Sequence, residues 1–99
     1  MATLWVREYR DRAVAGAGRE IQAAAEPGTD QTPVTFSTSA QSAAFAAGTT
    51  FVAVIGSAAF HYVVAEDPTA TTGALKVPAD TLIHIGVRAG QKIAAIAAA

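Results

Sequence analysis

The chain has 99 residues, of which 52% are hydrophobic and 15% charged, with a net charge of −1 and no cysteine. A chain this short forms one domain with a thin core, and without cysteine it gains stability neither from disulfides nor from thiolate metal ligands. The net charge of −1 gives no electrostatic case for binding nucleic acid, which would require a basic face. We therefore expect association with copies of itself or with other chains to add stability.

The first predicted element is a strand over Thr3–Tyr9. Alternation divides its side chains between two faces, with Leu4, Val6 and Glu8 on one and Trp5, Arg7 and Tyr9 on the other. The second face either packs on the domain's own sheet or docks on a partner, because Trp, Tyr and Arg are enriched at the centres of protein interfaces. The candidate interface residues are Trp5, Arg7, Tyr9, Arg10 and Arg12.

The chain is expected to loop over Asp11–Gly18, which contains two glycines, and to form a weak strand over Glu20–Ala25. The strand ends at Glu26-Pro27-Gly28, because Pro restricts the residue before it and Gly permits the positive φ of a turn. The predicted organisation is a single β domain over residues 1–99. Residues 1–18 are its N-terminal strand and arm or loop, and residues 19–99 are the sandwich core.

Pro33–Ser39 alternates like a half-buried strand, and Ser39–Ala47 favours a single helical turn or an irregular bend. The strongest strands are Thr49–Gly56 and Ala58–Ala65. Gly56-Ser57 between them predicts a two-residue hairpin with a type II′ turn, so these two strands are expected to pair.

After a loop over Glu66–Gly73, Leu75–Val77 is predicted as an edge strand that Pro78 ends. Thr81–Val87 alternates again, and Lys92–Ala97 is the last strand. About seven or eight short antiparallel strands without a helix predict an all-β fold, either a small β-sandwich or a jelly-roll-like barrel.

Residues Gln31–Ala65 contain no Lys, Arg, Asp or Glu. The uncharged stretch Ala43–Ala65 is long enough to span a bilayer, but it is rich in polar, glycine and β-branched residues and lacks flanking Lys or Arg clusters. We therefore expect it to be buried by sheet partners and sister subunits, with no contact to a membrane.

Few residues point to chemistry. His61 and His84 lie on separate predicted strands, whereas a metal site needs three or four ligands in fixed geometry. Glu66-Asp67 begins a turn, and no Gly-x-Ser-x-Gly elbow or phosphate-binding loop occurs. We expect no catalytic residues, no metal and no cofactor.

The order of several short segments resembles a group of small proteins from the virion genes of tailed bacteriophages and prophages. The similar segments are Ala2–Tyr9, Ala25–Pro27, Ser39–Phe45, Thr50–Val52, Asp67–Thr71, Leu75–Ala79, Gly86-Val87 and Gly90–Ile96. They span nearly the whole chain, while the charged stretch Arg10–Arg12 departs from the group's pattern.

The resemblance implies a non-enzymatic β-sandwich component of the virion. Its favoured role is a capsid decoration or cement protein, made in the host cytoplasm, that binds on the capsid surface between major capsid subunits, often as a homotrimer. Two alternatives stay open: a head–tail connector, tail or fibre-base structural protein, and a β-sandwich module that binds glycan on the host surface. The loops argue against the glycan module, because they hold mostly Thr, Ala, Pro and Gly.

Overall fold

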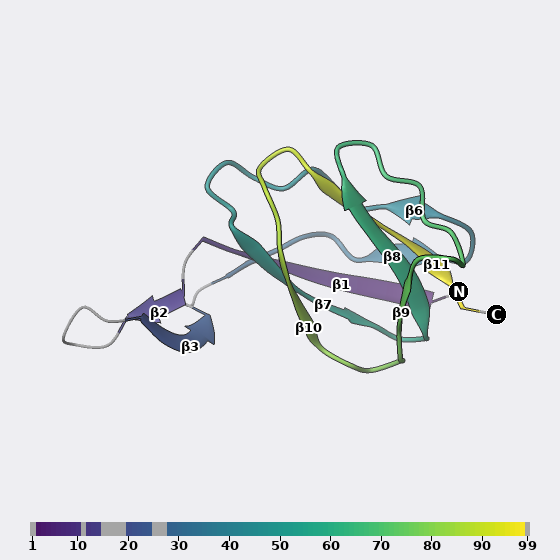
Figure 1. The fold of residues 1–99 in the computed structure, drawn as a ribbon, viewed down its shortest axis with the longest axis horizontal. Helices are drawn as coiled ribbons and strands as arrows, with labels where there is room; N and C mark the ends of the chain where they lie inside the picture. The colour runs from purple at the N-terminus through teal and green to yellow at the C-terminus, as the bar shows by residue number, and fades with distance from the viewer. Residues whose placement is uncertain (1, 11, 15–19, 25–27, 99) are drawn as a thin grey trace.

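The computed structural model describes residues 2–10, 12–14, 20–24 and 28–98. These residues form eleven strands and no helix (Figure 1). Nine strands make two antiparallel sheets that pack face to face, and two make a separate hairpin. The all-β sandwich predicted from the sequence is confirmed. Among the described residues, no helix has the length and apolar character needed to cross a membrane.

The five-stranded sheet is built around β1 (Ala2–Tyr9). On one side β1 pairs with β7 (Phe51–Gly56), and β10 (Ile83–Gly86) lies beyond β7 at the sheet edge. On its other side β1 pairs with β4 (Thr29–Asp30) and with β5 (Val34–Phe36). Its uninterrupted alternation lets one strand serve three partners.

The four-stranded sheet has the order β6, β11, β8, β9. These strands span Ala40–Gln41, Lys92–Ala97, Phe60–Ala65 and Leu75–Val77, respectively. The predicted edge position of Leu75–Val77 is confirmed, because β8 is its only partner among the described strands.

The predicted hairpin between the two strongest strands is wrong. β7 and β8 lie in different sheets, and the connection that contains Ser57 crosses from one sheet to the other. Both strands bury side chains in the same core from opposite sides, with Val52 and Val54 facing Phe60. Strands that are apolar on the core side can bury themselves across two sheets as well as side by side, so a short glycine-containing link does not fix their pairing.

The core lies between the sheets and has an aromatic centre. Phe36 and Phe60 meet edge to face, with ring centroids 5.8 Å apart. Both rings are fully buried, as are Leu4, Val52, Val54 and Ile93. The core-facing residues of the last two long strands match the predicted alternation, with Ile83 and Ile85 in β10 and Ile93 and Ala95 in β11.

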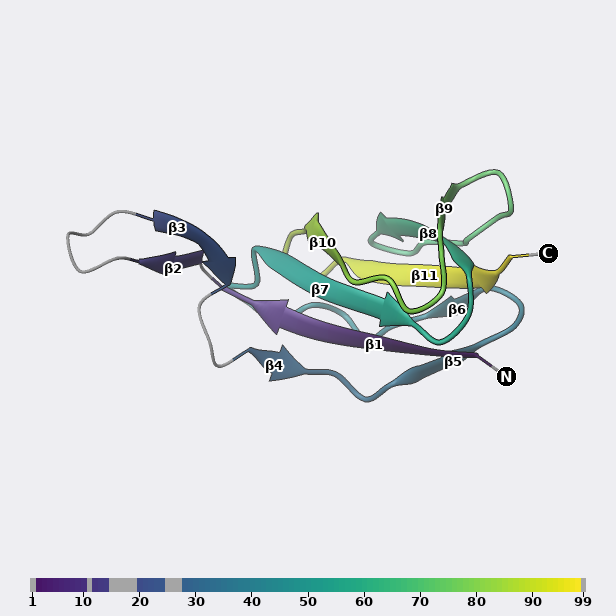
Figure 2. The same ribbon diagram turned by 90° about the horizontal axis from the view of Figure 1, so that it is seen from below.

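A hairpin of β2 (Arg12–Val14) and β3 (Glu20–Ala24) stands away from the sandwich (Figures 1 and 2). It lengthens the molecule, whose principal extents are 47 × 25 × 23 Å. The loop expected over Asp11–Gly18 is therefore wrong for Arg12–Val14, while Asp11 and residues 15–19 lie outside the described residues. The strand pairing also does not follow the expected boundary between an arm over residues 1–18 and a core over residues 19–99. β1 lies at the centre of the sandwich, and β3 belongs to the separate hairpin.

The stretch Ser39–Ala47, expected to be a turn or bend, contains the short strand β6 and then an irregular segment. Backbone hydrogen bonds from Ser42 N to Ile93 O and from Phe45 N to Gln91 O, both 2.8 Å, hold it against β11 and the residue before it. Phe45 is buried as a result. Strands as short as β4 and β6 carry too few residues for a period-2 signal, which is why the sequence did not predict them.

Candidate functional site

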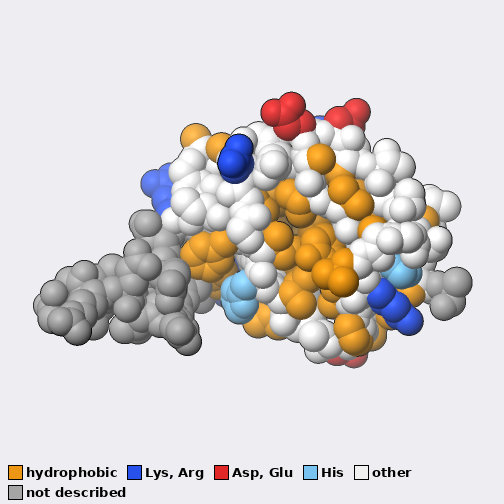
Figure 3. All heavy atoms as spheres, viewed as in Figure 1, with side chains coloured by type: hydrophobic (Ala, Val, Ile, Leu, Met, Phe, Trp, Pro, Cys, Tyr) orange, Lys and Arg blue, Asp and Glu red, His pale blue; other side chains and the backbone are white. Residues whose placement is uncertain are grey.

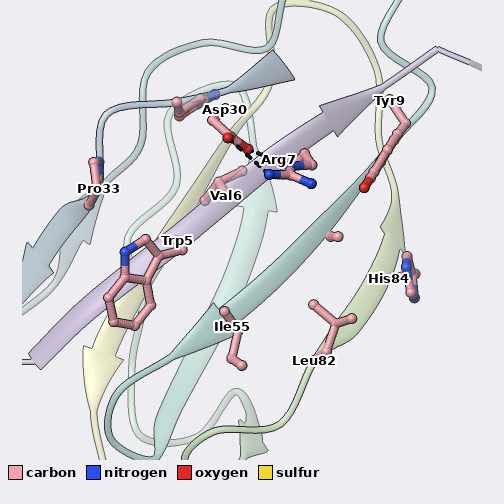
Figure 4. A pocket seen from close by; sticks show the side chains of 11 residues that line it. Trp5, Val6, Arg7, Tyr9, Asp30, Pro33, Ile55, Leu82 and His84 are labelled. Atoms are coloured by element: carbon pink, nitrogen blue, oxygen red, sulfur yellow. Dashed lines mark hydrogen bonds and ion pairs between the residues drawn. The ribbon is translucent and has the colours of Figure 1, made fainter. Parts of the chain in front are cut away.

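The outer face of the five-stranded sheet carries a groove of about 440 Å³, called here the outer groove (Figure 4). Its walls come from β1, β7, β10 and the segment around β4. The lining residues are Trp5, Val6, Arg7, Tyr9, Asp30, Gln31, Pro33, Ala53, Ile55, Leu82 and His84. Its volume and its mixture of apolar and polar side chains are typical of a binding site.

One end of the outer groove is apolar. Trp5 on β1 lies opposite Ile55 on β7, and Leu82 immediately precedes β10 on the far side of β7. Trp5 is 45% exposed and Leu82 56%, two of the three large hydrophobic residues exposed in the described chain. Their exposure leaves apolar surface in water that a partner could cover.

The middle of the outer groove is polar. Arg7 is the cross-strand neighbour of Asp30 and of Ala53, and His84 lies beyond Ala53. The Arg7 guanidinium makes a bidentate ion pair with Asp30, with Nε–Oδ1 and Nη2–Oδ2 distances of 2.5 and 3.0 Å. The hydrogen bond from Arg7 lowers the pKa of Asp30, and the same bond raises the pKa of Arg7. The pair places one positive and one negative group side by side, so it adds no net charge.

The other end of the groove is closed by stacked rings. Tyr9 stacks on Phe51 with centroids 5.1 Å apart, and Tyr9 is buried. Gly28 passes directly over this region: a Cβ there would lie 2.7 Å from Arg7 Cγ and 2.8 Å from Tyr9 Cε1. Only glycine allows such a close approach, so Gly28 helps to fix both side chains.

A buried carboxylate lies on the core side of β1 beneath the groove. Glu8 Oε1 accepts hydrogen bonds from Ala46 N at 2.7 Å and Thr49 Oγ1 at 2.8 Å, and Oε2 accepts one from Gln31 Nε2 at 3.1 Å. These contacts tie the β6–β7 connection to β1. Gln31 Oε1 is buried without a hydrogen-bond partner among the described atoms. The sequence pattern placed Glu8 on the correct face but gave no sign of its donors, which come from distant segments.

The structure brings together three of the five predicted interface residues. Trp5, Arg7 and Tyr9 all line the outer groove. Arg10 does not: its side chain lies beside Gly48, and its backbone carbonyl accepts a hydrogen bond from Thr50 Oγ1. The side chain of Arg12 lies outside the described residues.

Sequence reasoning missed the other walls of the groove. The predicted alternation put Leu82 and His84 on one face of their strand, but nothing indicated that β10 pairs with β7 or that this face adjoins Trp5. Asp30 gave no signal, because β4 has only two residues.

The outer face of the four-stranded sheet is covered by the chain itself. The segment after β8 folds back over it, since Gln41 Nε2 donates to Asp67 Oδ1 at 2.9 Å and to Pro68 O at 2.7 Å. Ala70 is buried there, and its N–H donates to Ser39 Oγ at 2.9 Å. The outer face of the five-stranded sheet, by contrast, carries the outer groove, which is open and lined by described residues.

The two histidines lie in different sheets, His61 in β8 and His84 in β10. The Nδ1 atom of His61 is 2.8 Å from Ala74 O, a hydrogen bond that holds the imidazole against the covering segment. Within the ranges that the structure describes, no group of three or more His, Asp or Glu residues could hold a metal ion.

Comparison with models of protein families, with curated proteins and with solved structures finds no match to this chain.

Proposed function

We propose that the chain is a structural protein of a tailed-phage particle, a capsid decoration or cement protein that docks on major capsid subunits through the outer groove. One observation carries the proposal: the outer face of one sheet is covered by the chain itself, while the other exposes Trp5 and Leu82 around the Arg7–Asp30 pair. A protein that needed both faces only for its own fold would gain by covering both.

The residue types in the outer groove suit contact with another protein. An exposed Trp at the apolar end offers a large, rigid side chain for burial, and Arg7 is held in a fixed position by Asp30. Trp and Arg are the side chains that most often dominate interface energetics, particularly when surrounding contacts exclude water. The resemblance of the order of segments to small virion proteins supports placing the chain in a phage particle.

The copy number in purified particles tests whether the chain is a capsid protein. Quantitative mass spectrometry of particles from the phage or prophage that encodes the chain is expected to find hundreds of copies. A count near six or twelve would instead assign the chain to the neck or tail, the first alternative. Absence from the particle would contradict both.

A binding experiment tests the groove. Capsid shells lacking the chain are incubated with Trp5→Ala or with Leu75→Ala, which removes an exposed side chain (67%) from the edge of the other sheet. We expect Trp5→Ala to bind roughly tenfold more weakly or worse, because truncating a central Trp typically costs more than 1 kcal/mol. Leu75→Ala is expected to bind like the unchanged protein. Equal loss with both variants would exclude the groove as the docking site.

One specific observation favours the alternative that the chain binds glycan. The apolar face of a sugar ring can stack on an indole while its hydroxyls bond planar polar groups, and Trp5, Arg7 and Asp30 line the same groove. Trp5 is the only tryptophan of the chain. Its fluorescence can therefore be followed during titration with disaccharides, and a saturable change that Asp30→Asn abolishes would favour this alternative.

A further inference from the structure

The free edge of the five-stranded sheet lies at β10. This strand pairs with β7 on one side, and none of the described strands pairs with its other side. Its surroundings are uncharged, because Thr81–Val87 contains no Lys, Arg, Asp or Glu. Edge strands usually carry charges or prolines that prevent pairing with other chains. β9, at the edge of the other sheet, follows that rule with Lys76 and the adjacent Pro78, whereas β10 has neither safeguard.

The alternation of hydrogen bonds between β10 and β7 shows which backbone groups of β10 point away from β7, toward the free edge. Val87 N donates to Thr50 O at 3.0 Å, in register with the pairs Ile85–Val52 and Ile83–Val54. Hydrogen-bonded and non-hydrogen-bonded pairs alternate along an antiparallel ladder. The N–H and C=O groups of Leu82, His84 and Gly86 therefore point away from β7, and none of the described backbone hydrogen bonds uses them.

We infer that β10 pairs antiparallel with β10 of a second copy of this chain, about a twofold axis at His84. In this register His84 lies opposite His84 of the second copy, and Leu82 lies opposite Gly86. All three outward-facing residues of each copy then exchange backbone hydrogen bonds with the other. The two five-stranded sheets become one continuous sheet across the dimer. A closed twofold dimer is the commonest homo-oligomer, and strand addition at a free edge is a recurrent way to build one.

The side chains fit this register on both faces. On the outer face, exposed Leu82 of one copy lies over Gly86 of the other, and a Cβ built at Gly86 meets no atom within 4 Å. On the core-facing side, Ile83 of one copy is opposite Ile85 of the other. Both isoleucines are only partly buried in the single chain. Figure 3 shows hydrophobic side chains gathered in the middle of the face where Figure 1 draws β10 and β8.

The absence of charge favours a second copy over an unrelated strand. An uncharged, alternately apolar edge is best complemented by a strand that is also uncharged and apolar, and β10 supplies such a segment in every copy. The thin core of a 99-residue chain also gains from the extra burial. The dimer and the docking proposed for the outer groove both involve Leu82 and His84, but the dimer is tested by mass in solution and the docking by binding to capsid shells, so either can fail alone.

The first measurement is the mass of the purified chain in solution by sedimentation equilibrium from micromolar to submillimolar concentration. We expect twice the 10.0 kDa of one chain. Amide hydrogen exchange followed by NMR is expected to show protection at Leu82, His84 and Gly86 that disappears on dilution. A monomer throughout this range, or a trimer, would overturn the proposal.

A charge swap at the axis tests the register. His84→Lys and His84→Glu each place like charges opposite one another in the dimer, which is unfavourable for directly opposed strand residues. His84 is exposed, so both variants are expected to fold. Each alone should dimerise roughly tenfold more weakly than the unchanged chain, and the mixture should form the Lys–Glu heterodimer, identified by native mass spectrometry.

Lys76→Glu on the β9 edge is the matched control and should leave the dimer intact. His84→Pro removes an outward N–H without removing a bond to β7, and should give a folded monomer by circular dichroism and mass. Dimers that survive both His84→Lys and His84→Pro would overturn the proposal, as would a mixture of the Lys and Glu variants that forms no heterodimer.

Discussion

Glu8 is the residue on which the attachment of the β6–β7 connection depends. Its carboxylate accepts hydrogen bonds from Ala46, Thr49 and Gln31 in a site that is almost closed to water. We expect Glu8→Ala to lower the free energy of unfolding by roughly 2–3 kcal/mol, because it leaves buried donors unpaired. Urea denaturation followed by circular dichroism measures the change.

Thr49→Val provides the control for this prediction, because it removes one donor and keeps the shape of the side chain. It should cost about 1 kcal/mol. If Glu8→Ala were as mild as Thr49→Val, the carboxylate would not be what holds the connection in place.

The Arg7–Asp30 pair makes stability depend on pH in a definite direction. The folded-state pKa of Asp30 lies below its ordinary value of 3.8, chiefly because Arg7 donates a hydrogen bond to the carboxylate. The pair's contribution is therefore fully present above the ordinary value and is lost as pH falls through the depressed folded value. Both groups are exposed, so the contribution is small.

We predict that the melting temperatures of the unchanged protein and of Asp30→Asn differ at pH 6 and converge as pH falls below 3.8 and through the depressed folded-state pKa of Asp30. Thermal unfolding at a series of pH values checks this, and sodium chloride should also reduce the difference at pH 6. A difference that stayed constant down to the lowest pH would contradict an origin in the ion pair.

At the scale of single elements, the crossing from β7 to β8 depends on a small residue. A Cβ at Gly56 would lie 2.7 Å from Cδ1 of Phe60, whose ring is fully buried in the aromatic centre of the core. We expect Gly56→Ala to cost roughly 1–3 kcal/mol, because the ring has no free space in which to move. Gly73→Ala is the control: its nearest neighbour would be Thr71 Oγ1 at 3.8 Å, so its urea midpoint should match that of the unchanged protein.

The sequence predicted correctly which face of a strand is buried where the alternation of apolar residues is long. It did not predict which strands pair with each other. The faces of β1, β10 and β11 followed from alternation, because each buries one side in the core. The pairing of β7 with β8 did not follow from the turn-like link at Gly56-Ser57, since both strands are equally able to pack across the sandwich. The residues of a turn determine where the chain reverses its direction. The sheet that the next strand joins is decided by contacts between residues distant in sequence.

The candidate site was predictable to the same extent. Trp5, Arg7 and Tyr9 share a face because they alternate along one strand, and that face does line the groove. Their neighbours Leu82 and Asp30 come from β10 and β4 through sheet register, which no local pattern contains. The predicted interface residue Arg10 does not share this face, because β1 ends at Tyr9 and the Arg10 side chain lies beside Gly48.

For the whole molecule, the difference between the two outer faces leads to a prediction about the assembled state. In the free chain Trp5 and Leu82 are accessible on the outer groove, and Leu75 is accessible at the edge of the opposite sheet. Hydroxyl-radical footprinting with mass spectrometry should therefore modify all three in the chain diluted to the monomer. If the outer groove docks on the particle, modification of Trp5 should fall severalfold on assembly, because burial removes the indole from solvent.

Leu75 is the internal reference in this experiment, because it lies on β9 in the other sheet, away from the groove. Its modification should change little between the free and assembled chain. Protection of Leu75 with Trp5 still reactive would mean that the particle meets the opposite side of the sandwich. Protection of Leu82 in the free chain at high concentration, with Trp5 still reactive, would report the edge pairing at β10, since Leu82 adjoins both the groove and that edge. The same labelling thus separates the two contacts that the fold leaves available.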